Sequence, residues 1–240
     1  MQTSTRTGVI AGVVAAVTLL LIAVAGCGAV ALWALNNSAE DEFELSSTAT
    51  TAEGNGEADE ADTPAEGATT WEVTSGSEAG YRIDEVLRGL EKTATARTED
   101  VTGELTLEGA KVSDATVTVQ LEGLTSDAAL RDDKVRSDYL ETDQFPEATF
   151  TLAGPLELSG EPEVGAPVST EAEGTLELHG VTRDVTVSLD AQLTAADSME
   201  VVGSAPIALA DYDIEVPDIS GIVKASPEGS VEFKLQLAPA

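Results

Sequence analysis

From residue 71 to the carboxyl terminus, apolar and polar residues of the 240-residue chain alternate with a period of two. In one such segment, Val117, Val119 and Leu121 are separated by the polar residues Thr118 and Gln120. The same pattern occurs in the segments 104–108, 175–179, 185–190 and 231–237. Because successive side chains of a β-strand point to opposite faces, each segment predicts a strand with one buried face and one solvent-exposed face.

One stretch of this region, residues 126–140, does not alternate. Its apolar residues have no period of two, and it begins with Ser126 and Asp127, which are types that cap helices. Glycine-containing turns separate the alternating segments at 108–110, 179–181 and 227–229. We therefore expect about seven to nine antiparallel strands and one short helical insertion in residues 71–240. The periodicity fits either a barrel or a sandwich.

Residues 1–37 are dominated by a run without charge from residue 9 to residue 35. A helix of that length would be about 40 Å long, which is more than the roughly 30 Å of a bilayer core. Arg6 precedes the run, and no further Lys or Arg occurs until Arg82. The positive-inside rule therefore predicts a single-pass cell-membrane protein whose carboxyl-terminal domain lies on the extracytoplasmic side.

This amino-terminal segment admits three interpretations. The sequence Val24-Ala25-Gly26-Cys27 resembles the cleavage site of bacterial lipoproteins, in which Cys27 would be lipidated and become the new amino terminus. However, apolar residues continue past Cys27 to Leu35, whereas a lipoprotein usually turns polar after its cysteine. We therefore favour an uncleaved signal anchor over a lipoprotein and over a secretory signal that is removed. The two leading interpretations both leave the following domain on the outer face of a membrane.

Residues 38–70 consist mainly of Ser, Thr, Ala, Gly, Glu and Asp and contain no Lys or Arg. Phe43 and Leu45, near the start, are the only bulky apolar residues. Such a segment cannot bury enough apolar surface to offset its ordering entropy, so the composition predicts a disordered acidic linker. A random coil of about 33 residues would span roughly 30 Å.

The composition argues against several classes of function. The chain has 44 acidic and 12 basic residues, and its formal net charge of −32 would repel the phosphate backbone of a nucleic acid. Cys27 is the only cysteine and His179 the only histidine, so a metal site with several His or Cys ligands is not available. The Arg131-Asp132 pair is more typical of a loop held by charge-assisted hydrogen bonds than of an acid–base pair. We therefore expect neither an enzyme, nor a metal site, nor a cofactor.

Two motifs in residues 71–240 resemble the signatures of the YceI-like family. The first comprises the Arg-Asp pair and the non-alternating stretch at 130–140, followed by Phe145-Pro146-Glu147-Ala148-Thr149-Phe150. The second is the stretch 174–185, in which Gly180-Val181-Thr182 follows an alternating segment. The resemblance implies an extended, lipocalin-like antiparallel barrel of about eight strands that binds a polyisoprenoid chain in a long apolar tunnel. Residues 89–98 depart from the family pattern, because many members have a histidine in this region and this chain has none.

In such a barrel, the inward-facing residues are the candidate ligand-binding residues. A barrel of about eight strands either fills itself with side chains or holds one small ligand. Aromatic residues make up only 4% of the chain, so the inward residues are mostly Val, Leu and Ala, which favours an open interior. The residues that we expect to line the interior are Tyr81, Val117, Val119, Leu121, Phe145, Phe150, Leu176, Val185, Val187 and Phe233.

Two functions remain open at this point. The first is a carrier or sequestering protein for a polyisoprenoid or another lipid-like molecule. The second is a non-enzymatic cell-envelope protein with a filled barrel that acts through its surface. An internal apolar void on the order of several hundred cubic ångströms would indicate the first. A filled interior with a large exposed apolar patch would indicate the second.

Overall fold

The computed structural model describes residues 39–47, 67–219 and 221–240. The chain divides into two compact units, Met1–Ser38 and Ala39–Ala240, and all the described residues belong to the second. The predicted anchor at 1–37, with Cys27, and most of the predicted linker at 38–70 lie outside the described residues. Within the ranges described, no helix has the length and the apolar character needed to span a membrane.

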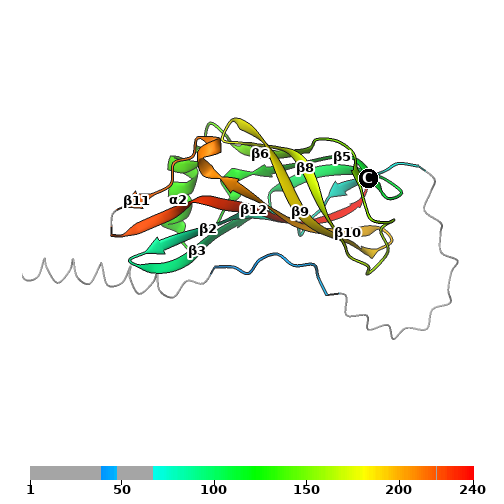
Figure 1. The fold of residues 1–240 in the computed structure, drawn as a ribbon, viewed down its shortest axis with the longest axis horizontal. Helices are drawn as coiled ribbons and strands as arrows, with labels where there is room; N and C mark the ends of the chain where they lie inside the picture. The colour runs from blue at the N-terminus through cyan, green and yellow to red at the C-terminus, as the bar shows by residue number, and fades with distance from the viewer. Residues whose placement is uncertain (1–38, 48–66, 220) are drawn as a thin grey trace, which may run out of the picture. The chain divides into compact units, whose positions relative to one another are not determined.

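The second unit is built from antiparallel strands (Figure 1). The longer strands are β2 (Glu78–Leu87), β3 (Leu90–Thr98), β4 (Val101–Glu108), β5 (Lys111–Gln120), β8 (Val168–Leu178), β9 (Val181–Ala195), β10 (Ser198–Ala208) and β12 (Val223–Pro239). The shorter strands are β1 (Thr69–Val73), β6 (Glu147–Leu152), β7 (Leu156–Glu157) and β11 (Asp218–Ile219). The alternating segments of the sequence lie in β4, β5, β8, β9 and β12, so the period of two identified strands correctly.

The sheet closes into a barrel because β1 pairs with β4 on one side and with β12 on the other. The closed ring has the order β1-β4-β5-β6-β8-β9-β10-β12, which makes eight strands, and neighbouring strands of the ring are antiparallel. A closed ring has no edge strand and encloses an interior. The choice between barrel and sandwich is therefore decided in favour of the all-β barrel that the family resemblance implied.

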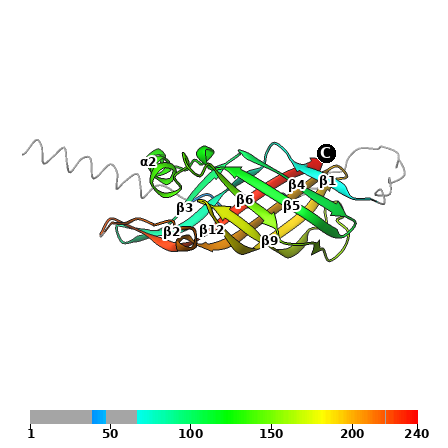
Figure 2. The same cartoon turned by 90° about the horizontal axis from the view of Figure 1, so that it is seen from above.

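The hairpin of β2 and β3 continues the wall at one end of the barrel (Figure 2). Strand β12 pairs with β2 along most of its length and with β1 only at its end. Ser77 spans the break between β1 and β2, since its hydroxyl donates to the Thr74 carbonyl at 2.8 Å and accepts from the Gln236 N–H at 2.9 Å. At the opposite end of β2, the strand ends of β11, β12, β2 and β3 form a four-stranded projection. We call this projection, residues 85–92, 218–219 and 221–224, the lip.

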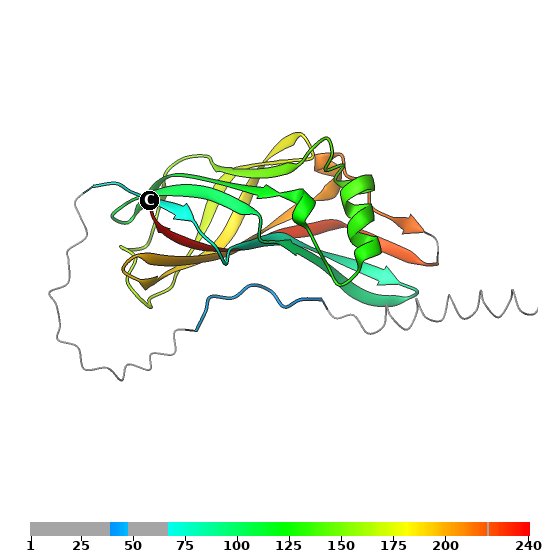
Figure 3. The same ribbon diagram turned by 180° about the vertical axis from the view of Figure 1, so that it is seen from behind.

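The insertion between β5 and β6 is helical, as predicted. It contains the 3-10 turn η1 (Leu121–Gly123), the α-helix α2 (Ala129–Lys134) and the π-helical turn η2 (Val135–Tyr139), and α2 lies at the lip end of the barrel (Figure 3). The predicted cap is wrong, because Ala128 precedes α2 and no side chain caps it. Instead, the buried carboxylate of Asp132 accepts a hydrogen bond from the Ser126 N–H at 3.1 Å and holds the loop from within the helix.

Residues 39–47, the blue segment in Figure 1, lie against the outer wall of the barrel, although the sequence placed them in a disordered linker. We call this segment the strap. At its amino end, the Glu40 N–H donates to Thr95 Oγ1 at 3.2 Å, and Arg82 donates to the Glu40 carbonyl at 2.8 Å. At its carboxyl end, Gln192 donates to the Ser46 carbonyl at 3.0 Å. Side chains on the outside of β2, β3 and β9 therefore bind the main chain of the strap.

Two carboxylates under the strap are almost completely buried. Glu200 on β10 is 2% exposed and Glu232 on β12 is 5% exposed. Glu232 is 3.2 Å from Arg82 and 2.9 Å from Arg97, and Glu200 is 3.2 Å from Lys234. These partners are needed because a buried carboxylate without one has a large desolvation cost.

Candidate ligand-binding cavity

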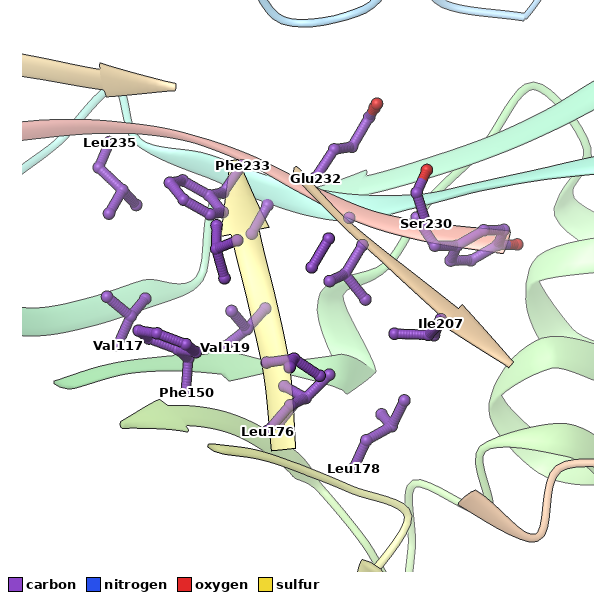
Figure 4. Close-up of a pocket in the computed structure, with 18 of the residues that line it drawn as sticks. Val117, Val119, Phe150, Leu176, Leu178, Ile207, Ser230, Glu232, Phe233 and Leu235 are labelled. Carbon is purple, nitrogen blue, oxygen red and sulfur yellow. The ribbon is translucent and has the colours of Figure 1, made fainter. Parts of the chain in front are cut away.

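The barrel encloses a cavity of about 320 Å³, and most of the side chains along it are apolar. Every second residue of a strand contributes to its wall, as with Val117 and Val119 on β5 and Val185 and Val187 on β9. In the close-up of Figure 4, side chains from several strands converge on the same space. The interior therefore holds the kind of void that a carrier function requires.

Nine of the ten residues expected to line the interior do lie along this cavity. They are Tyr81, Val117, Val119, Leu121, Phe150, Leu176, Val185, Val187 and Phe233. They come from six strands and from η1. Although these elements are distant in sequence, the folded barrel places the nine residues around one space. That these residues contact a ligand stays a prediction.

The tenth residue, Phe145, lies outside this wall. Its ring meets the ring of His179 edge to face, with the ring centroids 4.7 Å apart. It also covers the β8–β9 turn, since a Cβ atom at Gly180 would come within 2.6 Å of the phenyl ring. Phe145 precedes Pro146 and the start of β6, so the alternation that directs Phe150 inward does not extend to it. The structure thus places Phe145 in the packing of a turn.

Two features of the wall keep the interior open. Several buried wall positions carry alanine, namely Ala94, Ala172 and Ala205. In addition, two phenyl rings fold against glycines on neighbouring strands. A Cβ atom would come within 2.3 Å of Phe150 if placed at Gly174, and within 2.6 Å of Phe233 if placed at Gly203. The glycines thus leave room for these rings at the wall, where they do not cross the centre of the barrel.

The structure adds a set of wall residues that the sequence analysis did not include. They lie on β10 and on the segment that follows it, and are Met199, Val201, Ala205, Ile207, Leu209 and Ile214. On β10 a signal was present, because the first four of these residues all have odd numbers and so share one face of the strand. The last two lie in η3 (Leu209–Tyr212) and after it, where a period of two has no meaning.

Polar groups reach the cavity next to α2. Arg131 lines this end and forms ion pairs with Glu85 at 3.4 Å and Asp127 at 3.0 Å. Burial raises the pKa of Tyr81 to about 12, although the nearby positive charge of Arg131 acts in the opposite direction. The phenol of Tyr81 therefore stays neutral at physiological pH, and both side chains are hydrogen-bond donors for the polar end of a ligand.

The single histidine of the chain is engaged in the fold away from the cavity. His179 lies outside the cavity wall, with Nδ1 2.9 Å from the Tyr212 carbonyl oxygen and Nε2 3.1 Å from Glu141 Oε2. Among residues 39–47, 67–219 and 221–240, no three His, Cys, Asp or Glu side chains are grouped so as to hold a metal ion. A guanidinium such as that of Arg131 is a poor general base. The cavity is thus suited to hold an apolar chain with a polar group at one end.

Comparison with known proteins identifies the family. The model of the YceI-like domain matches residues 71–237. The chain belongs to the YceI-like family. The match begins within β1 and ends within β12, so it covers nearly all of the closed barrel.

Solved structures similar to this YceI-like domain include a polyisoprenoid binding domain from Saccharophagus degradans. It is 19% identical to this chain, with a TM-score of 0.56, and the likeness covers 72% of this chain and 99% of the other. BcnA from Burkholderia cenocepacia is 17% identical, with a TM-score of 0.48, over 65% of this chain and 95% of its own. At 19% identity the first likeness establishes the fold and leaves the ligand to be argued from the cavity. A search of curated proteins gave no match.

Proposed function

We propose that this YceI-like protein binds a long apolar ligand, a polyisoprenoid or another lipid, inside its barrel and carries or sequesters it without transforming it. The observation that carries the proposal is the cavity of about 320 Å³ with its largely apolar wall. The similar domain from Saccharophagus degradans, which is described as polyisoprenoid binding, supports the same class of ligand. The alternative, a barrel that acts only through its surface, gives no role to this space.

The driving force would be the removal of ligand hydrocarbon from water. Each five-carbon isoprene unit contributes roughly 3 to 4 kcal/mol before ordering costs, at about 0.8 kcal/mol per methylene group. A few units therefore suffice for micromolar binding after those costs are subtracted. Because most of the wall is apolar, we expect the affinity to depend little on salt concentration.

We further propose that the barrel acts on the extracytoplasmic side of the cell membrane, attached through residues 1–37. The uncharged run at 9–35 and the absence of basic residues between Arg6 and Arg82 support this topology. A protease added to intact cells should cut within the predicted linker at 38–70 and release the barrel. Protection of the barrel while other outer proteins are cut would show that the topology is wrong.

The binding proposal is tested on residues 39–240, which contain the closed ring, its core and the strap. Polyprenyl alcohols of increasing length are titrated while the midpoint of thermal unfolding is measured. A ligand at 100 times its Kd adds about 2.7 kcal/mol to the free energy of unfolding, which raises the midpoint of a domain this size by roughly 5 to 10 °C. If no long-chain apolar compound raises the midpoint, and none co-purifies by mass spectrometry, the carrier proposal is wrong and the surface alternative stands.

A further inference from the structure

A row of aliphatic side chains crosses the lip. Ile219 on β11 is paired with Val223 on β12, Val223 with Leu87 on β2, and Leu87 with Leu90 on β3. Directly paired residues of neighbouring strands point to the same face of the sheet. The four side chains therefore form one continuous apolar row on one face of the lip.

This face is the continuation of the cavity wall. On β2, Ile83 and Glu85 line the cavity, and Leu87 is the next residue with the same orientation. On β12, Ala225 lines the cavity and Val223 is two residues before it. The apolar surface inside the barrel thus extends past the ion pair of Glu85 with Arg131 and out along the lip.

The outer part of this surface is open to solvent. Leu90 is 47% exposed and Ile219 is 53% exposed. Leu130, on the neighbouring helix α2, is 83% exposed. Clustered aliphatic side chains in contact with water at the mouth of an apolar cavity are typical of a surface that is covered by a partner.

The position of the strap indicates which partner could cover the lip. Its amino end is bound at Arg82 on β2. Arg82 is five residues from Leu87 of the lip, a distance of about 17 Å along the strand. Its carboxyl end is bound at Glu200 on β10, which is paired with Gln236 on β12. Gln236 is thirteen residues from Val223 of the lip, or roughly 40 Å along β12. The amino end of the strap therefore lies nearer the lip than its carboxyl end does. Only residues 36–38 separate the strap from the uncharged run at 9–35.

The lip also differs from the rest of the chain in charge. Residues 85–92, 218–219 and 221–224 contain three basic residues, Arg88, Lys92 and Lys224, and three acidic residues, Glu85, Glu91 and Asp218. The whole chain has 12 basic and 44 acidic residues. A surface with no net charge can approach the anionic head groups of a membrane, from which a net charge of −32 is repelled.

We propose that the lip docks on the phospholipid bilayer to which the chain is attached, and that the apolar ligand passes between bilayer and cavity along its aliphatic row. This inference rests on the proposed ligand binding and the proposed membrane attachment, and it names the surface through which the two operate together. The aliphatic side chains would enter the layer of acyl chains, so that ligand hydrocarbon moves between two apolar environments and meets little water on the way.

The docking is tested with the full chain in vesicles of phosphatidylcholine and phosphatidylglycerol. A photoreactive benzoylphenylalanine is placed at Leu90 in one variant and at Val164 in the other. Val164 is a matched control because it is 58% exposed but lies beside Leu193, near the end of β9 that is remote from the lip. We expect lipid adducts of the barrel at least ten times more often from the Leu90 site. Equal yields at the two sites, or an adduct to a second copy of the chain, would overturn the docking.

The passage of ligand is tested with a Leu90→Glu and Ile219→Glu double variant, since both residues belong to the aliphatic row and neither lines the cavity. We expect transfer of a fluorescent polyprenyl compound between vesicles and the protein to slow at least ten-fold, with an unchanged equilibrium affinity. Val164→Glu, the matched control, should leave the rate unchanged. An unchanged rate in the double variant would overturn the proposed route while leaving the binding function intact. Absence of polyprenyl binding in the unaltered protein would instead reject the function on which the route rests.

Discussion

The inner and outer faces of strands β10 and β12 are both buried, but by opposite kinds of side chain. On the inner face, Val201, Phe233 and Leu235 line the apolar cavity. On the outer face, Glu200 and Glu232 lie under the strap and pair with basic side chains. The inner face leaves space because apolar groups need no specific partner, whereas each buried carboxylate of the outer face is held by a basic side chain.

This difference shows how one strand can hold two sites. Phe233 and Glu232 are adjacent in sequence, and Figure 4 shows the Glu232 carboxyl pointing away from the space that Phe233 borders. A shift of β12 by one residue would exchange the two faces and turn a carboxylate into the cavity. The alternation along residues 231–237 of β12 therefore fixes both the cavity and the strap site. Substitutions on one face should affect one site only.

The largest effect is expected on the inner face, from Val187→Trp. Val187 is buried and lines the cavity, so an indole at this position would occupy the space of the ligand. We expect the affinity for a polyprenyl alcohol to fall about 100-fold, equivalent to roughly 2.7 kcal/mol. The affinity is measured by thermal titration of residues 39–240.

Thr186→Trp is the matched control for this variant, because the adjacent residue points outward and is exposed. Overpacking lowers stability by roughly 1 to 3 kcal/mol, so circular dichroism must show that the Val187→Trp protein is folded. If it does not fold, the smaller Val187→Leu replaces it. A folded inner-face variant with unchanged affinity would place the ligand elsewhere.

On the outer face, Glu200→Gln should release the strap and leave the ligand affinity unchanged. The substitution removes the ion pair with Lys234 and weakens the acceptor for Ser46. We expect the free energy of unfolding to fall by about 2 kcal/mol and the amides of residues 39–47 to exchange faster with deuterium. A strap that stays protected while the ligand affinity falls would contradict the separation of the two faces.

A smaller effect is expected from Phe43→Ala in the strap itself. The guanidinium carbon of Arg97 lies 3.8 Å from the centre of the Phe43 ring, a cation–π contact at a partly exposed site. Its loss should destabilise the bound strap by about 1 kcal/mol, read as faster deuterium exchange in residues 39–47. Phe43→Trp should retain the contact and the protection. Equal losses in both variants would show that the shape of the side chain matters and not its aromatic face.

The smallest effect is expected from mild acid. Burial by itself would raise the pKa of Glu200, but hydrogen bonds from Ser46, Gln236 and Lys234 outweigh it and hold that pKa below its ordinary range. A carboxylate with a lowered pKa contributes stability above its unfolded value, and this contribution is lost as the pH falls through the folded value. Strap protection should therefore be constant above about pH 5 and decline below it. Glu200→Gln should flatten this decline, and an identical decline in the variant would assign it to other groups.

The features that could be predicted are those that depend on neighbouring residues of the chain, and the features that were missed depend on contacts between distant residues. Val117, Val119 and Val187 were assigned to the inner face because alternation within a strand is set by the geometry of its own backbone. Phe145 was placed wrongly on the cavity wall, since it lies just outside β6 and packs against His179 from another part of the chain. The wall residues on β10 could have been found by the same alternation. Leu209 in η3 and Ile214 after it could not, because neither lies in a strand.

The sequence by itself determined the strands, the helical insertion and, through its motifs, the family. It did so because the period of two and the turn residues are local properties of the chain. Only the tertiary structure decided that β1 closes the ring, that residues 39–47 bind the outer wall, and that Phe150 and Phe233 fold against glycines and leave the centre open. The strap is the clearest case, because its composition predicts disorder and only partners such as Arg82, Thr95 and Glu200 hold it in place. Those partners lie on strands distant in sequence, and contacts between distant residues depend on how the whole barrel is folded.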